Sequence, residues 1–238
     1  MLFWGDPTWF LAIPIMILVF WAQARVKSAF REWSNVGTSS GVTAAHVARD
    51  ILDRNGLSDV PVEYVEGELT DHYDPKTRVV KLSASTYSSS SVAAIGVAAH
   101  EVGHAIQHDQ AYVPLFMRNM IFPVARLGDM LGPWIVMLGL MFAYATRGGG
   151  GIALVMIDVG ILLFAVAVGF YVITLPVEFN ASSRAVAILE TGGYMTRDEV
   201  AGAKKVLNAA ALTYVAAAAG ALMMLIRLLI LRDRARRD

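Results

Sequence analysis

Two histidines and a glutamate near the middle of the chain are spaced to hold a zinc ion and to use it. The segment His100-Glu101-Val102-Gly103-His104 matches the pattern H-E-x-x-H. Residues four apart lie on one face of an α-helix, about 6 Å from each other, so both imidazoles can bind one ion. Glu101 lies beside that ion and can take a proton from an activated water molecule. The pattern therefore predicts a zinc-dependent hydrolase, with His100 and His104 as ligands and Glu101 as general base.

A catalytic zinc site also needs a third protein ligand and an open fourth position. His108 follows His104 by another four residues, but on a continuous helix it lies about 12 Å from His100 along the axis, too far to share the ion. Glu178 is the strongest candidate, because it directly follows an apolar run, where the chain is expected to leave the bilayer. Asp129, at the start of an earlier apolar run, is the competing candidate.

Four apolar runs approach the roughly 20 residues that a membrane-spanning helix needs, at 8–24, 129–145, 151–175 and 209–231. Hydrophobic residues make up 56% of the chain and charged residues 17%, whereas soluble domains have about 45–50% and about 25%. The segment TRGGGG joins the second and third runs as a hairpin turn. We therefore predict a mainly α integral membrane protein with about four transmembrane helices. A cleaved signal peptide is the alternative for the first run, but residues 1–9 lack the basic charges that it requires.

The polar segments must position the metal site. Residues 25–115 are expected to form a small α+β, zincin-like catalytic unit. Within it we predict a helix over 43–55, a turn over 71–76, a strand over 78–84, and the H-E-x-x-H helix over 92–107, capped by one of the serines at 88–91. The other segments are predicted to be transmembrane helix 1 (1–24), a transmembrane helical hairpin (116–175), a helical segment that carries Glu178 (176–208), and transmembrane helix 4 with an arginine-rich tail (209–238).

Composition limits the other functional classes. The chain has no cysteine, which excludes disulfides, thiolate metal sites and cysteine nucleophiles. Its 20 basic and 20 acidic residues cancel, which argues against a nucleic-acid-binding protein.

Two other functions compete with catalysis. The runner-up is a non-catalytic, zinc-containing membrane assembly or quality-control factor, although a structural zinc site usually has four ligands, commonly cysteines. A transporter or channel would need several ionisable residues within the spans, and the sequence offers Asp158 and Arg227 there. These two could form an ion pair that holds the third and fourth spans together, or Arg227 could extend to the interface alone.

Three segments of the chain resemble a known family. They are GELTDHYDPKTRVVKLSASTYSSSSVAAIGVAAHEVGHAIQH, LPVEFNASSRAVAIL and LNAAALTYVAAAAGAL, and they closely resemble the YugP-like bacterial membrane zinc metallopeptidases over essentially the whole chain. The similarity to the HtpX and CAAX prenyl protease families is more distant. The resemblance implies a gluzincin-like endopeptidase that hydrolyses peptide bonds of membrane or membrane-proximal proteins. It implies one Zn²⁺ per chain, held by His100, His104 and Glu178, with Glu101 as general base.

The resemblance also bears on the residues that face the substrate or support the ligands. It implies that residues 78–84 form an edge strand that pairs with an extended peptide substrate, as in β-augmentation. Relatives tend to carry an aspartate four residues after the ligand glutamate, as a partner for a ligating histidine, and here that position is Ser182. The orientation of that histidine would then depend on Asn180 or on Ser182 itself. Separately, the oxyanion donor that such a site needs could be His72, Tyr73 or Arg184, which the sequence does not rank.

The membrane orientation follows from the basic residues near the spans. The side that would carry the site has Arg25, Lys27, Arg31, Arg118, Arg126, Arg184, Arg197, Lys204 and Lys205, and the other side has Arg147, Arg232, Arg234, Arg236 and Arg237. The positive-inside rule then favours a multi-pass protein of the cell (inner or plasma) membrane with a cytoplasmic catalytic side, although the arginine-rich tail opposes this. The expected partners are a protein or peptide substrate and the lipid bilayer, and a regulatory partner or a homo-oligomer is left open. Gly128-x-x-x-Gly132 could permit close helix contact but is a weak signal for dimerisation.

Overall fold

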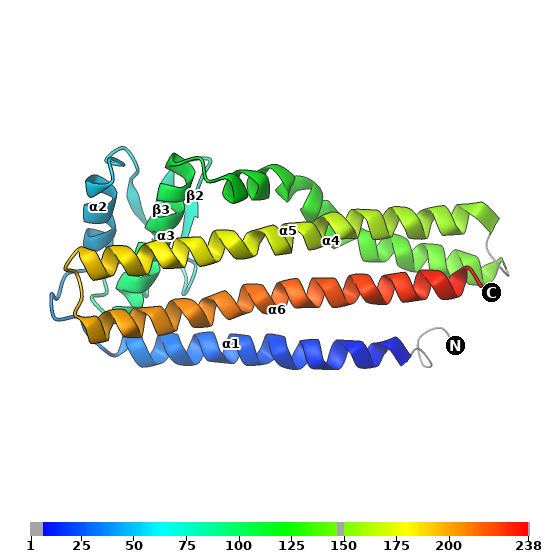
Figure 1. Cartoon of the computed structure of the whole chain (residues 1–238), viewed down its shortest axis with the longest axis horizontal. Helices are drawn as coiled ribbons and strands as arrows, with labels where there is room; N and C mark the ends of the chain where they lie inside the picture. Colours follow the sequence, from blue (N-terminus) through cyan, green and yellow to red (C-terminus); the bar gives the residue numbers. More distant parts are fainter. Residues whose placement is uncertain (1–6, 147–149, 238) are drawn as a thin grey trace. The chain divides into compact units, whose positions relative to one another are not determined.

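The computed structural model describes residues 7–146 and 150–237. In chain order its elements are the 3-10 helix η1 (Pro7–Leu11), α1 (Ala12–Ser34), α2 (Ala44–Arg54), β1 (Val62–Val65), β2 (His72–Asp74), β3 (Val79–Ser83), α3 (Val92–Asp109), α4 (Val113–Ala145), α5 (Gly150–Thr191) and α6 (Arg197–Ala235), as labelled in Figure 1. Residues 147–149 of the predicted hairpin turn lie outside the described residues, and so do the first six residues of the predicted first helix.

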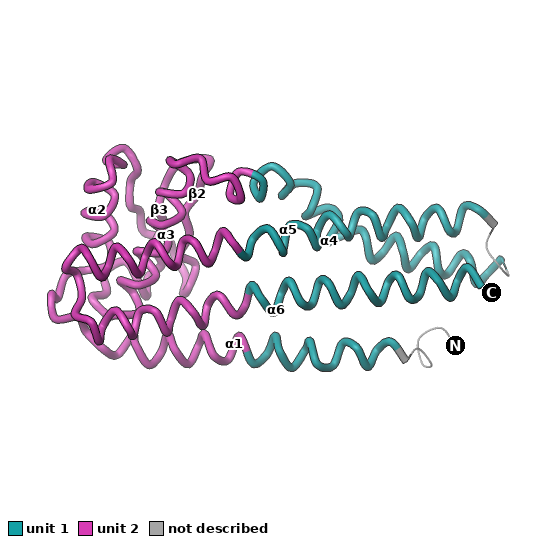
Figure 2. The backbone as a smooth tube through the Cα atoms, viewed as in Figure 1, with its two compact units in different colours: residues 1–21, 117–175, 214–238 teal, residues 22–116, 176–213 magenta. Residues whose placement is uncertain are grey.

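The chain divides into two compact units (Figure 2). Unit 1 comprises Met1–Trp21, Met117–Leu175 and Tyr214–Asp238, and unit 2 comprises Ala22–Phe116 and Pro176–Thr213. The boundaries fall within α1, α4, α5 and α6, so each of these long helices contributes to both units. Unit 2 contains the ends of α1 and α5 and the starts of α4 and α6. This alternation is what a chain that crosses the membrane four times requires.

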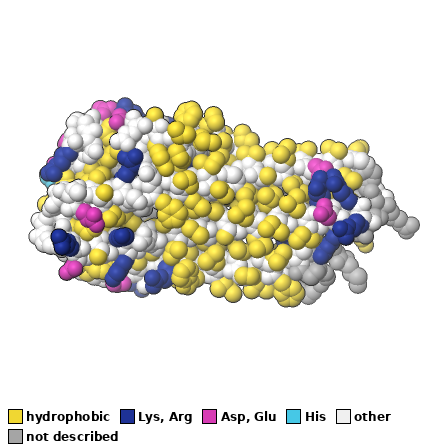
Figure 3. All heavy atoms as spheres, in the orientation of Figure 1, with side chains coloured by type: hydrophobic (Ala, Val, Ile, Leu, Met, Phe, Trp, Pro, Cys, Tyr) yellow, Lys and Arg dark blue, Asp and Glu magenta, His cyan; other side chains and the backbone are white. Residues whose placement is uncertain are grey.

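Within the described residues, four helices are long and apolar enough to cross a membrane: Thr8–Ser34, Val113–Ala145, Gly151–Thr191 and Arg197–Ala235. They confirm the prediction of a mainly α protein with four apolar spans. The helices extend well beyond the apolar runs, since α5 has 42 residues, or about 63 Å at 1.5 Å per residue, about twice the hydrocarbon core. Pro176 does not end α5, so Glu178 lies on the same helix as the third apolar run. Figure 3 shows hydrophobic side chains covering this face of the spanning helices, as contact with lipid requires.

Within unit 1, helices α4 and α5 pack closely at glycine residues. An added Cβ at Gly128 would lie 2.0 Å from the carbonyl oxygen of Leu163, and one at Gly132 would lie 2.9 Å from the carbonyl oxygen of Gly160. Helices approach this closely where small residues leave room for the neighbouring backbone. The Gly128-x-x-x-Gly132 motif therefore serves a contact within the chain.

Asp158 pairs with arginines of the tail rather than with Arg227. Its carboxylate lies 2.5 Å from Arg232 Nε and 3.2 Å from Arg236 Nη2, whereas the Arg227 guanidinium lies 4.1 Å from the centre of the Trp9 ring. The predicted Asp158–Arg227 pair is wrong because α6 continues as a helix into the tail and brings later arginines to the level of Asp158.

Unit 2 contains a three-stranded sheet in the order β1-β3-β2. β1 pairs with β3 in parallel, and β2 pairs with β3 antiparallel. β3 is therefore the central strand, and the expectation that residues 78–84 form an edge strand is wrong. The predicted turn over 71–76 contains the strand β2, and the chain turns just after it, where the Asp74 carboxylate accepts hydrogen bonds from Lys76 N and Thr77 Oγ1. The outer strands of the sheet are β1 and β2.

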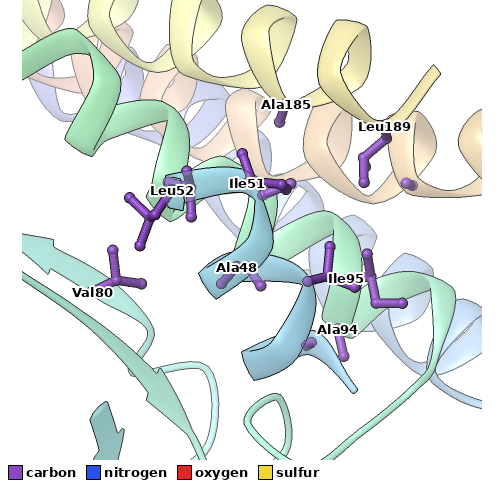
Figure 4. Packing of buried hydrophobic residues seen from close by; sticks show 14 of the residues in the cluster. Ala48, Ile51, Leu52, Val80, Ala94, Ile95, Ala185 and Leu189 are labelled. Atoms are coloured by element: carbon purple, nitrogen blue, oxygen red, sulfur yellow. The ribbon is translucent and has the colours of Figure 1, made fainter. Parts of the chain in front are cut away.

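The core of unit 2 surrounds α3 (Figure 4). Its apolar side chains come from α2, α3, β3, α5 and α6, and include Ala48, Ile51, Leu52, Val80, Ala94, Ile95, Ala185 and Leu189. Helix α3 begins at the predicted cap, where Ser91 Oγ accepts the N–H of Ala94 at 3.2 Å. Because packing and capping both hold α3, this helix is a rigid support for the side chains that it carries.

Candidate metal centre

Helix α3 presents the H-E-x-x-H residues toward α5. It contains no proline and runs without interruption. Gly103 lies directly against α5, because an added Cβ there would be 2.8 Å from the carbonyl oxygen of Ala181. The missing side chain at Gly103 thus lets the two backbones approach each other. Glu178 lies about one turn before Ala181 on α5, which places its carboxylate opposite the two histidines.

His100, His104 and Glu178 converge on one point. Nε2 of His100 lies 3.3 Å from Oε2 of Glu178, and Nε2 of His104 lies 3.6 Å from the same oxygen. The ligand atoms of the three residues all lie within 4.8 Å of one another. Tetrahedral zinc with nitrogen and oxygen ligands at about 2.0–2.2 Å separates neighbouring ligand atoms by about 3.3–3.5 Å. The three side chains are therefore close to the spacing that a zinc ion requires.

The structure separates the competing candidates from this cluster. Nδ1 of His108 contacts Tyr73 Oη at 2.8 Å, and His108 is not part of the cluster. Asp129 belongs to unit 1, where its carboxylate accepts a hydrogen bond from Tyr171 Oη. In the part of the chain that the structure describes, Glu178 is the carboxylate that joins the two histidines.

Gln107, which the sequence analysis did not single out as a site residue, determines the tautomer of His104. Arg184 Nε can only donate, and it donates to Asn180 Oδ1. That oxygen also accepts from Gln107 Nε2 at 2.9 Å, and the same amide nitrogen donates to the Val177 carbonyl. The Gln107 oxygen therefore faces Nδ1 of His104, 3.0 Å away, so Nδ1 carries the proton. The lone pair of His104 lies on Nε2, the atom that faces the carboxylate.

The sequence held one signal for Gln107. It follows His104 by three residues, which places both side chains on the same face of α3. A glutamine that is 0% exposed also needs partners for its amide. Those partners come from α5, about 70 residues later, so spacing alone could not have assigned its role.

Ser182 orients the other histidine. Its Oγ lies 3.1 Å from Nδ1 of His100. If Nε2 of His100 binds a metal ion together with Glu178, the ring proton is on Nδ1, where the serine hydroxyl can accept it. Ser182 thus supports one histidine directly, while Asn180 supports the other through Gln107. Both of the alternatives that the sequence left open are used.

The charges of the site favour a positive charge between the three side chains. Two nitrogen lone pairs and a carboxylate oxygen at 3.3 and 3.6 Å repel one another unless a bound cation or a proton lies between them. Burial lowers the pKa of His104, but the hydrogen bond and charge of Glu178, together with the charge of Glu101, outweigh burial and raise that pKa. Two imidazoles and one carboxylate are a donor set of catalytic zinc sites. The residues present therefore fit zinc.

Glu101 lies beside the cluster, and β2 holds its carboxylate. Oε2 of Glu101 accepts the main-chain N–H of Tyr73 at 2.9 Å. In a β-strand, the main-chain N–H and C=O of one residue point to the same side. Because the N–H of Tyr73 points to Glu101, both of these groups of Tyr73 face α3 rather than β3. Burial raises the pKa of the Tyr73 phenol, which keeps its proton at neutral pH. Of the three candidate oxyanion donors, Tyr73 contacts Glu101, whereas His72 is exposed and Arg184 belongs to the network behind the histidines.

Comparisons with known proteins agree with this geometry. The family described as "Putative neutral zinc metallopeptidase" matches residues 8–233 of the chain. The chain is 51% identical over 218 residues to "Putative membrane protease YugP" of Bacillus subtilis (strain 168), and the match covers 92% of this chain and 93% of that protein. No solved structure was found to match the chain.

Proposed function

The chain belongs to the neutral zinc metallopeptidase family, and from this premise we propose that it is a membrane-embedded endopeptidase that hydrolyses peptide bonds of membrane or membrane-proximal proteins. The observation that carries the proposal is the convergence of two imidazole nitrogens on one buried carboxylate, with a second carboxylate beside them. We assign His100, His104 and Glu178 as the ligands of one Zn²⁺ per chain and Glu101 as the general base.

Each side chain of the site has a distinct task in this mechanism. A bound zinc ion would polarise the scissile carbonyl and lower the pKa of water toward about 7. His100, His104 and Glu178 would hold the ion, and three ligands leave a fourth position open, which favours a catalytic over a structural site. Glu101 takes a proton from the attacking water and returns it to the leaving amine. Because Tyr73 N–H engages Oε2 of Glu101, Oε1 is the oxygen available to carry that proton.

Strand β2 brings a main-chain group to the proposed general base. It is an outer strand of the sheet, and the main-chain N–H of its residue Tyr73 donates to Glu101. Because this N–H faces α3 and is already engaged, the outer edge of β2 at Tyr73 does not pair with a peptide strand.

The membrane placement rests on the four apolar helices and on charge. All four spanning helices contribute to unit 2, which contains the metal centre. The basic residues that flank the spans on this side outnumber those on the other side, nine to five, which supports a cytoplasmic site in a multi-pass protein of the cell membrane.

Chelation tests the proposed activity. The purified full-length protein in detergent should hydrolyse fluorescein-labelled casein, lose this activity with 1,10-phenanthroline, and regain it with Zn²⁺ but not with Mg²⁺, because the donor set suits zinc. Hydrolysis that persists in the chelator would contradict a zinc-dependent mechanism. A protein that contains zinc but cleaves nothing would instead support the assembly-factor alternative.

A further inference from the structure

His108 is close to the metal centre in sequence but has a different task there. We propose that His108 is a positioning residue: through the hydroxyl of Tyr73 it fixes strand β2 against α3 and thereby holds Glu101 in its working orientation. This inference rests on the proposed peptidase function, because it concerns the residue assigned as general base.

The geometry places Tyr73 across two turns of α3. Glu101 and His108 are seven residues apart, which puts them on one face of the helix. Tyr73 contacts both: its main-chain N–H donates to Glu101 Oε2 at 2.9 Å, and its Oη lies 2.8 Å from His108 Nδ1. The two rings also approach each other, with 5.8 Å between their centres. One tyrosine thus ties the strand to the helix at two points, one of which is the general base.

Strand β2 needs the contact between Tyr73 and His108 in addition to the one with Glu101, because the strand is short. β2 has three residues and is an outer strand, paired with β3 through three residue pairs. Short outer strands have few main-chain hydrogen bonds and open at low free-energy cost. Without the bond to His108, the Tyr73 main chain would be less firmly placed, and the Glu101 carboxylate would lose its fixed donor. A carboxylate that is turned away from the substrate cannot transfer a proton efficiently.

The hydroxyl and the imidazole can be removed separately. Tyr73→Phe keeps the main-chain N–H and the ring but removes the hydroxyl, and His108→Leu removes its partner. His108→Asn is the conservative variant, because an asparagine amide can occupy the place of Nδ1 and bond the phenol. The matched control is Tyr194→Phe, which breaks another tyrosine hydrogen bond of unit 2, to Asp50.

The kinetic readout uses a quenched-fluorescent peptide derived from a casein site that the parent cleaves. Tyr73→Phe and His108→Leu should each lower kcat about tenfold, with KM changed by less than about twofold and with zinc content unchanged. The double variant should be no worse than the poorer single variant, because both changes break the same contact. His108→Asn should recover most of kcat, and Tyr194→Phe should retain it. A kcat within about twofold of the parent in both single variants, or losses that add, would overturn the proposal.

A second readout does not require activity. Amide hydrogen exchange of the peptide that contains residues 72–74 should be faster in Tyr73→Phe and in His108→Leu than in the parent and in Tyr194→Phe. Unchanged exchange would overturn the positioning role even if the parent cleaves no peptide, whereas faster exchange without hydrolysis would sustain it and reject the proposed function alone.

Discussion

Replacing Gly103 by alanine tests whether close packing of α3 on α5 sets the metal centre. The added Cβ would lie 2.8 Å from the carbonyl oxygen of Ala181 and 3.3 Å from its Cα. Non-bonded heavy atoms rest at about 3.5 Å, so the two helices must separate by about 0.7 Å at this point. Metal–ligand distances tolerate deviations of about 0.2 Å. The substitution should therefore let Glu178 reach an ion held by the two histidines only if the contact at residue 103 is strained.

The expected loss of zinc affinity depends on whether the metal-free or the zinc-bound form of the variant is strained. The metal-free protein can relieve the contact at Gly103 by opening, whereas the zinc-bound form must keep the close approach. Overpacking of this kind costs about 1–3 kcal/mol, and this cost should appear as a zinc affinity weaker by about 5–150-fold. Alanine also favours a helix over glycine by about 1 kcal/mol, but this gain is present in both forms and cancels in the affinity.

The assay is zinc competition with a chromogenic chelator, for the full-length protein in detergent. Gly169→Ala is the matched control, because Gly169 is also a helical glycine but nothing lies within 4 Å of a Cβ added there. The control should bind zinc like the parent. The reasoning is refuted if Gly103→Ala binds zinc within about twofold of the parent, or if both variants weaken binding equally.

Three further predictions address single groups. Gln107→Leu removes the acceptor that sets the tautomer of a ligand histidine, and it should weaken zinc binding about 10–100-fold in the same chelator assay; unchanged affinity would contradict that role. Glu178→Ala should release zinc while Asp129→Asn keeps it, by elemental analysis, and the reverse pattern would exchange their assignments. Tyr194→Phe should lower Tm at neutral pH, because the hydrogen bond from Tyr194 lowers the pKa of Asp50. A carboxyl group whose pKa is lowered by folding stabilises the fold at pH values above its unfolded pKa of about 3.9. This stabilisation is lost as the pH falls through the folded pKa, so the Tm difference should shrink below about pH 4. A constant Tm difference would refute the linkage.

Much of this structure could be predicted from local patterns in the sequence. The four apolar runs and the uninterrupted helix around His100 and His104 depend on residues close together in the chain, and the structure contains them. Glu178 could be nominated because few carboxylates border an apolar run. That it meets the histidines depends on a close approach at Gly103, which local pattern does not reveal.

The features that the sequence analysis missed depend on distant partners. Strand order places β3 between two short strands, one of which resembles a turn because it lies in the segment DHYDPK. The partners of Asp158 depend on how far α6 continues as a helix into its charged tail. The role of Gln107 depends on acceptors supplied by α5. In each case the decisive contact joins segments that are far apart in the chain.

The central claim is that Glu101 performs proton transfer at a zinc site built from other residues, and Glu101→Gln tests it most directly. The amide keeps the shape of the side chain and can still accept the N–H of Tyr73, but it cannot take a proton from water. The measurement is zinc content and peptide hydrolysis on the same purified sample. The account predicts about one zinc per chain, with hydrolysis reduced about 10²–10⁴-fold. Hydrolysis within about threefold of the parent would contradict it.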